Sequence, residues 1–525
     1  MMKKYRIYQV LMLLLLVTSS CKDYLDINTN PNSATSASAL LVLPQAIVGS
    51  ASISNQYNAY GGHFGGYIAN AGGFSGFGNL FNYQLVPGDY NNLWVNTYDN
   101  LQDYKYVIDQ TEGNDELAYA NATAKIMTAL NYQKLVDAFN NVPYSEALKA
   151  NENLTPKYDD AATIYQDLVS KLDEAIGIID TAKFPKSLNS SSDPLFAGDM
   201  IKWKKFANTI KLRILVRVSG VAALSDFVKT KFGAIDNTLG YITDDAIVNP
   251  GYVKDKPNPF WNTWGYSNTG ALSNTSRVPT KFAFGFYKGQ KLLDSGRGSV
   301  IYKNFTTNTP VNQLGNEVDA PTIITNYSTW YSGLFSSASS ISNSLGILKG
   351  PNQGQVLMLA AEVHFLQAEA KLKGYIPGDL AVNFDQGIAA SFTYLYKDVT
   401  NTLSATKDVA ADVATYKKDN EESKLVNIKL ATTPAQKLEA IITQKYIAVN
   451  MVNSEEGWNE FRRTGYPVTT PGGDGYHNIA SMLSTSTRID KMPSRILYPA
   501  SEQSYNSANF KTVNQFSDLI FWDPN

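Results

Sequence analysis

Residues 119–139 read YANATAKIMTALNYQKLVDAF and carry the clearest structural signal in the chain. Their apolar positions recur at intervals of three and four, at Tyr119, Ala122, Ile126, Ala129, Tyr132, Val136 and Phe139. This spacing is typical of an α-helix that buries one face. The stretch therefore predicts a long helix packed against other apolar elements.

The same period recurs along the chain. One further segment with this period begins directly after Asp159-Asp160, and these two aspartates are suitable helix N-caps. The other segments with this period are 201–219, 355–374, 380–397, 434–452 and 455–464. Consecutive helices with one apolar face each bury those faces against their neighbours. We expect a mostly α fold of stacked tetratricopeptide-like helix pairs, without a strict repeat.

Segments without this period are expected to be irregular. Residues 22–45 contain turn-forming residues and predict an extended tether. Residues 60–90 hold so many glycines that a helix is disfavoured, and we expect a loop rich in Gly and aromatic residues. Residues 250–350 are rich in Asn, Thr, Ser and Gly and predict long loops with short strands or helices.

The chain of 525 residues is long enough to bury a large core. We expect a signal peptide at residues 1–20 and a single domain over 21–525. Within that domain, the helical scaffold is expected at about 90–220 and 355–465, and a large irregular, loop-rich excursion at about 221–354.

The N-terminal residues are typical of an export signal. Basic residues precede an apolar run at 10–17 (VLMLLLLV), which is shorter than the about 20 residues that cross a bilayer. Cys21, the sole cysteine, follows directly, as in a bacterial lipobox whose thiol becomes acylated. Lipoboxes usually carry Leu where this chain has Thr18, and an ordinary cleaved signal is the alternative. We expect lipid attachment at Cys21.

Composition argues against several functions. The net charge is −2 and no dense basic patch occurs, so a nucleic-acid partner is not expected. The three histidines, His63, His364 and His477, lack the close spacing of a zinc site. We expect neither a metal nor a cofactor.

Catalytic motifs are also missing from the sequence. The paired acids Asp244-Asp245 and Glu455-Glu456 are neighbours that point to different sides, and we interpret both as surface or capping acids. No G-x-S-x-G elbow occurs, and the glycines at 72–78 lack the Lys-Ser/Thr of a phosphate loop. Arg213 and Arg217 share a helix face and are assigned to internal salt bridges. A glycan-degrading enzyme is therefore the weakest alternative.

Aromatic clusters in the irregular regions are the best candidates for ligand contact. The segments PFWNTWGY (259–266), TWYS (329–332) and 74–77 combine rings with polar side chains. Flat sugar faces stack on such rings while amides and carboxylates hold the hydroxyls. The alternative is that the rings pack the loops onto the helices. The candidate ligand-binding residues are Phe74, Phe77, Trp261, Trp264, Tyr266, Trp330 and Tyr331.

The remaining tryptophans in helical patterns are assigned differently. Trp94, Trp203 and Trp458 lie at periodic apolar positions, so we expect them in the core.

Several sequence blocks, in order, resemble the SusD/RagB family of lipid-anchored, surface-exposed nutrient-binding proteins of Bacteroidetes. The blocks are 21–31 (CKDYLDINTNP), 124–130 (AKIMTAL), 137–148 (DAFNNVPYSEAL), 203–208 (WKKFAN) with 211–213 (KLR), 361–370 (AEVHFLQAEA), 456–467 (EGWNEFRRTGYP), 495–499 (RILYP) and 521–523 (FWD). They span nearly all of the chain after residue 20, which makes the resemblance specific.

The resemblance implies a helical fold with four degenerate tetratricopeptide-like units and no catalysis. It implies an outer-membrane location facing the cell exterior, and a TonB-dependent SusC-like barrel as partner, on which the protein acts as a lid. The ligand would be an oligosaccharide, or another nutrient such as a peptide. The family's ligand-binding aromatics lie in no shared motif, so none is carried over. A surface adhesin or scaffold protein remains an alternative.

Overall fold

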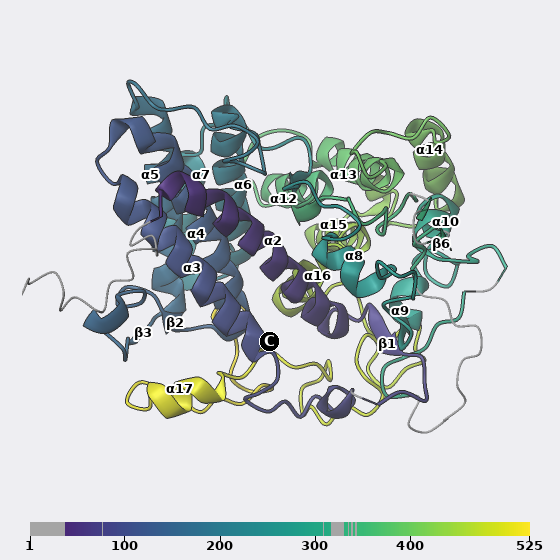
Figure 1. The fold of residues 1–525 in the computed structure, drawn as a ribbon. Coiled ribbons are helices and arrows are strands. Elements are labelled where there is room, and N and C mark those ends of the chain that lie inside the picture. Colours follow the sequence, from purple (N-terminus) through teal and green to yellow (C-terminus); the bar gives the residue numbers. More distant parts are fainter. Residues whose placement is uncertain are drawn as a thin grey trace, which may run out of the picture.

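Helices account for most of the regular structure, as the periodic segments predict (Figure 1). A computed structural model describes residues 37–524 with the exception of 76, 308, 317–329, 334, 338–339 and 342–343. Its buried apolar side chains form a continuous cluster that includes residues from Ala39 to Trp522. Trp94, Trp203 and Trp458 belong to this core, with 5%, 0% and 0% of their surfaces exposed, which confirms their assignment.

Long helices of the first half pack on one another in chain order. Contacts join α2 to α3, α3 to α4, α4 to α5, and α5 to α6. The bounds are α2 Ala39–Phe64, α3 Asn91–Thr111, α4 Ala118–Phe139, α5 Ala161–Thr181, α6 Met200–Val218 and the shorter α7 Ser225–Gly233. Asp160 caps α5 by accepting the Thr163 backbone N–H at 2.9 Å, as the sequence predicts.

Helices return after residue 359. The elements are α12 Ala360–Leu372, α13 Leu380–Tyr396, α14 Val409–Asp419, α15 Pro434–Ala448, α16 Ser454–Thr464 and α17 Ala500–Tyr505. Neighbours α12 and α13 pack as a pair, as do α15 and α16, so helix-pair stacking holds in both halves. Helix α14 was not predicted. Only Tyr416 is buried in it, so it lacks a strong apolar period.

Helix α2 overlaps two segments that were predicted to be non-helical, the tether at 22–45 and the glycine-rich loop at 60–90, and both predictions are wrong where they overlap it. It begins at Ala39, within the predicted tether, and continues through Gly61 and Gly62 (Figure 1). A Cβ at Gly61 would lie 2.1 Å from the backbone nitrogen of Glu455 in α16. The glycine therefore permits the close approach of α2 and α16, and tertiary packing outweighs the weak helix propensity of glycine.

The central region contains short elements, as expected. The helices are α8 Pro259–Trp264, α9 Lys281–Phe284 and α10 Ser295–Ile301. The strands pair two by two, antiparallel: β1 Ile68–Asn70 with β5 Arg277–Pro279, β2 Val142–Pro143 with β3 Tyr158–Asp159, β4 Ala246–Val248 with β8 Gln355–Met358, and β6 Phe335–Ser337 with β7 Ser340–Ile341. The β1–β5 pair places Asn70 opposite Arg277 and so ties the end of α2 to the central region.

A buried network of ion pairs joins the two groups of helices. Arg217 of α6 pairs with both Asp137 of α4 and Glu456 of α16. Lys134 of α4 pairs with Glu455 at 2.5 Å. Salt bridging by Arg217 is therefore confirmed. The interpretation of Glu455 and Glu456 as surface or capping acids is wrong, because both are 2% exposed and their charges are neutralised inside the core.

Of the other paired acids, Asp244 is exposed and Asp245 acts as a cap. Asp245 accepts the backbone N–H of Ala360, the first residue of α12, at 3.0 Å. The prediction of a surface or capping role therefore holds for this pair.

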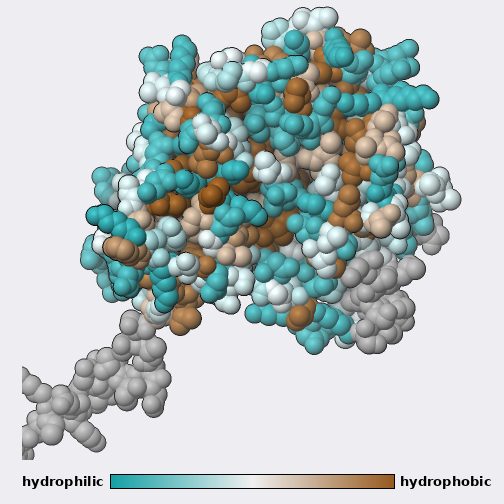
Figure 2. Space-filling model, turned by 90° about the horizontal axis from the view of Figure 1, so that it is seen from above, coloured by the Kyte–Doolittle hydropathy of each residue, from teal (hydrophilic) through white to brown (hydrophobic). Residues whose placement is uncertain are grey.

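The described helices show no candidate membrane span: none combines the length and the apolar character that crossing a bilayer requires. Figure 2 shows one face of the molecule, on which apolar residues lie in groups between hydrophilic ones.

Candidate functional site

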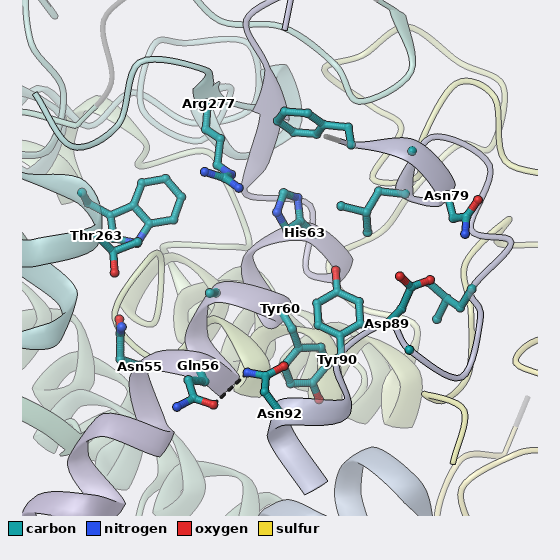
Figure 3. A pocket seen from close by; sticks show the side chains of 17 residues that line it. Asn55, Gln56, Tyr60, His63, Asn79, Asp89, Tyr90, Asn92, Thr263 and Arg277 are labelled. Atoms are coloured by element: carbon teal, nitrogen blue, oxygen red, sulfur yellow. Dashed lines mark hydrogen bonds between the residues drawn. The ribbon is translucent and has the colours of Figure 1, made fainter. Parts of the chain in front are cut away.

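A pocket of about 730 Å³ opens between α2, the loop that leads into α3, and α8 (Figure 3). We call it the His63 pocket, after the side chain near its centre. Its lining residues are Asn55, Gln56, Ala59, Tyr60, His63, Phe77, Gly78, Asn79, Leu80, Leu85, Gly88, Asp89, Tyr90, Asn92, Thr263, Trp264 and Arg277. Its volume lies in the range of small-molecule sites.

One face of α2 forms the floor of the pocket. Asn55, Gln56, Ala59, Tyr60 and His63 all line it. They are spaced by one, three, one and three residues, which places them on the same side of a helix. The helix that the sequence did not reveal therefore supplies a continuous wall of two amides, a tyrosine and a histidine.

The loop between α2 and α3 supplies the second wall. Tyr90 ends this loop in a left-handed conformation, with φ of 62°, directly before α3. Its half-buried ring meets the Tyr60 ring edge to face at 5.8 Å between centroids. Phe77 packs edge to face on His63 at 6.0 Å. Tyr90 is the most accessible ring of the pocket, because Phe77 and Tyr60 are 4% and 1% exposed.

The third wall is the end of α8. Asn258 caps this helix by accepting the Trp261 backbone N–H at 2.9 Å, and Pro259 occupies its first turn. Thr263 and Trp264 then face the pocket. The Trp264 ring is 2% exposed and meets the Trp330 ring edge to face at 5.0 Å, so it closes the pocket from behind.

Arg277 completes the site from strand β5. Asn274 fixes its backbone by accepting the Arg277 N–H at 3.1 Å and donating to the Arg277 carbonyl at 3.0 Å. Its guanidinium carbon lies 5.6 Å from the ring centre of Phe77 and 5.8 Å from that of Trp264. Figure 3 shows this side chain extending from the wall toward His63.

His63 is uncharged at neutral pH. Burial, and secondarily the positive charge of Arg277, lower the pKa of its imidazole to about 3. Its Nδ1 atom has no hydrogen-bond partner among the described residues. The histidine therefore contributes a neutral polar surface, and the pocket's positive charge comes from Arg277.

The site combines aromatic rings with side-chain amides. Asn92 donates to Gln56 Oε1 at 2.8 Å, drawn as the dashed line in Figure 3, while Asn55 and Asn79 also line the cavity. Amides of this kind hydrogen-bond hydroxyl groups in either direction. Apolar walls with a few placed polar groups are typical of binding pockets.

The seven predicted ligand-binding residues occupy three kinds of position in the structure. Trp264 and Phe77 line the pocket. Trp261 and Trp330 are 0% and 1% exposed, so the packing alternative describes them. Segment 259–264 forms a short helix rather than a loop. Trp261 lies on the side of this helix that is buried against the rest of the protein.

The other three predicted residues lie outside the pocket lining. Phe74 is 37% exposed, and Tyr266 and Tyr331 are half-buried. Tyr266 packs on Trp261 at 6.3 Å between ring centres. Cys21 lies outside the described residues.

Sequence reasoning missed Tyr60, His63, Tyr90 and Arg277. The spacing of 55, 56, 59, 60 and 63 was a helical signal that the surrounding glycines obscured. No sequence feature predicts that Arg277 lies in the His63 pocket, because the pairing of β1 with β5 brings it there.

The chain matches the family model described as SusD-like, starch-binding associating with outer membrane, over residues 30–499. It therefore belongs to the SusD-like family of outer-membrane-associated nutrient-binding proteins, in agreement with the sequence blocks. No curated protein matched this chain in a sequence search.

Solved structures share the fold. A chitin-binding protein is 22% identical, with a TM-score of 0.69 over 93% of this chain and 99% of its own. A chitin-binding SusD homologue from Flavobacterium johnsoniae is 20% identical, with a TM-score of 0.67 over 92% and 99%. A SusD homologue from Bacteroides fragilis is 20% identical, with a TM-score of 0.69 over 93% and 99%. At these identities the likeness establishes the helical fold.

Proposed function

We propose that this protein is a nutrient-binding lipoprotein of the outer membrane that holds an oligosaccharide in the His63 pocket. The observation that carries the proposal is the combination, in one cavity, of an accessible tyrosine ring, three deeper rings and several amides. Sugar C–H faces pack on rings, and amides satisfy the hydroxyls that burial would otherwise leave unpaired. The family description and the chitin-binding relatives support this ligand class.

Tyr90→Leu tests the pocket directly. Calorimetry against a panel of starch, chitin and plant-derived oligosaccharides should find affinities between about 1 μM and 1 mM for wild type. The variant should lose about 1–3 kcal/mol of binding free energy, by analogy with base–aromatic stacking. Tyr505→Leu is the matched control, since Tyr505 is 80% exposed and does not line the pocket. Equal binding by both variants would contradict the assignment.

Anchoring through Cys21 is the second part of the proposal. The position of this sole cysteine after the apolar run and the outer-membrane association of the family support it. Labelling cells with a fatty-acid probe should tag the wild-type protein, and Cys21→Ala should release it from the membrane fraction. An untagged protein that stays with the membrane in both forms would refute the lipid anchor.

A TonB-dependent SusC-like barrel is the proposed partner, with this protein as its lid. The family relationship supports this role. Detergent extracts of native membranes should yield a complex with such a barrel. Recovery of the free protein alone, in repeated pull-downs under mild detergent, would favour a surface adhesin.

We also propose that the protein releases intact ligand without cleaving it. The adjacent acids Glu455 and Glu456 are buried in ion pairs and are therefore not available as an acid–base pair for glycoside hydrolysis. Reducing-end assays over many hours should detect no product. Steady product formation by a clean preparation would overturn this part of the proposal.

A further inference from the structure

Arg277 carries a positive charge that no described residue neutralises. Its guanidinium forms no ion pair and no side-chain hydrogen bond with the described part of the chain, and its carbon lies within about 6 Å of the ring centres of Phe77 and Trp264. Partial burial lowers the pKa of Arg277, yet a guanidinium stays protonated at any physiological pH. Ring faces attract a cation only modestly, and they leave its N–H donors unused.

The remaining charges of the pocket lie apart from Arg277. Asp89 is the acidic residue of the lining, and its Oδ2 accepts the Val86 backbone N–H at 2.8 Å. Figure 3 shows Asp89 and Arg277 on opposite sides of His63. With His63 neutral, one side of the pocket is positive and the other is negative.

We propose that the His63 pocket selects an acidic sugar, with Arg277 binding the carboxylate of a hexuronic acid residue. This inference rests on the proposed function of the pocket as an oligosaccharide site. A planar guanidinium matches a planar carboxylate through two parallel N–H···O bonds. Such a group would supply the missing counter-charge and use the donors that the rings leave free.

Asp89 restricts the ligand further. A carboxylate beside Asp89 would be repelled, whereas neutral hydroxyl groups can bond to Asp89 and to the nearby Asn92. The preferred ligand is therefore an oligosaccharide in which an isolated uronic acid adjoins neutral sugars. A continuous polyuronate fits the charge distribution less well.

The experiment uses matched ligands that differ only at the carboxyl group. Uronate-containing oligosaccharides from several plant and animal glycans are titrated by calorimetry before and after chemical reduction of their carboxyl groups to alcohols. Wild type should bind at least one acidic form about tenfold or more tightly than its reduced form. Added salt should weaken binding of the acidic form and leave binding of the reduced form unchanged.

Two substitutions link this preference to Arg277. Arg277→Gln should erase the difference between acidic and reduced forms, and Arg277→Lys should retain part of it, because it keeps the charge and loses the fork. Lys229→Gln, at an exposed cation on α7, is the control and should behave as wild type. Melting curves verify that each variant is folded.

The outcomes separate this inference from the proposed function. If reduced and acidic forms bind equally and Tyr90→Leu weakens both, the pocket binds sugars but the acid preference is wrong. If Arg277→Gln keeps the preference, another group recognises the acid and the assignment of Arg277 fails. If no glycan binds and acidic peptides do, both the oligosaccharide function and the acidic-sugar inference are overturned.

Discussion

Two arginines of this protein, Arg217 and Arg277, lie in different surroundings. Arg217 is 1% exposed and contacts the carboxylates of Asp137 and Glu456. Arg277 is partly exposed, contacts two aromatic rings and pairs with no described carboxylate. The first charge is neutralised within the fold, whereas the second is available to a ligand.

The surroundings of Arg217 explain why its charge is structural. The network extends to Lys445, which pairs with Glu460 at 2.8 Å and with Glu362 at 3.3 Å. It connects helices α4, α6, α12, α15 and α16, which come from both groups of helices. A buried pair that loses one partner leaves an uncompensated charge in a medium of low polarity. The network therefore fixes how the two groups join.

The largest effect is expected for Arg217→Met. The substitution leaves Asp137 and Glu456 without their main counter-charge, and it should lower the free energy of unfolding by about 3–5 kcal/mol. Urea unfolding followed by circular dichroism measures this change. Lys105→Met removes one side of the exposed pair with Asp109 and should cost only about 0.3–0.5 kcal/mol. Similar losses in both variants would mean that the network contributes little.

Acid should weaken the part of this network in which Arg463 pairs with both Glu460 and Glu369. The Arg463 guanidinium, 2.7 Å from Glu369, and nearby Lys373 overcome the effect of burial and lower the pKa of Glu369 from its usual 4.5 to about 2. Because the folded-state pKa is depressed, the stabilisation by Glu369 is present above pH 4.5 and is lost as the pH falls toward 2.

Burial raises the pKa of Asp137 and Glu455, so these groups act in the opposite direction in the wild-type curve. The difference between wild type and Glu369→Gln isolates one carboxylate. It should be about 3 kcal/mol near neutral pH, and it should shrink steadily below about pH 4.5. A difference that stays constant down to about pH 2 would contradict the ion-pair account.

The packing of α2 on α16 should also be sensitive to substitution, with a smaller effect. Gly61→Ala would place a Cβ within 2.1 Å of the Glu455 nitrogen and should destabilise the fold by about 1–3 kcal/mol. Gly177→Ala in α5 is the control, because nothing lies within 4 Å of the added carbon. This control should be neutral or stabilising by up to about 1 kcal/mol. Thermal unfolding of both variants compares the two sites.

The smallest effect on stability is expected at Arg277. Removing this partly buried charge deprives no carboxylate of the described residues of a partner, so Arg277→Gln should change the free energy of unfolding by no more than about 0.5 kcal/mol. The same variant should lose the preference for the acidic form of the ligand over its reduced form. A strong loss of stability would place Arg277 in the same structural class as Arg217.

Sequence reasoning succeeded where local pattern and tertiary structure agree. The period of 119–139 predicted α4, and Asp160 predicted the start of α5. It failed for α2, since glycine disfavours a helix locally, whereas here Gly61 permits the tertiary packing of α2 against α16. It also placed Glu455 and Glu456 at the surface, because their counter-charges come from α4 and α6, distant in sequence.

The site was predicted in part for the same reason. Clusters of rings pointed to Trp264 and Phe77, and both line the pocket. The sequence does not show whether an aromatic side chain faces a pocket or the core. Trp261 and Trp330, which are buried, therefore could not be distinguished from the two pocket-lining residues. Arg277 became a candidate only when the pairing of β1 with β5 placed it beside His63.

A crystal structure with a bound oligosaccharide that contains one uronic acid tests the central claim most directly. The account predicts a sugar in the His63 pocket, with its ring against Tyr90 and its carboxylate paired with Arg277. Binding elsewhere, for example in the groove of about 400 Å³ lined by Lys105, Tyr132 and Lys171, with the His63 pocket empty, would contradict it.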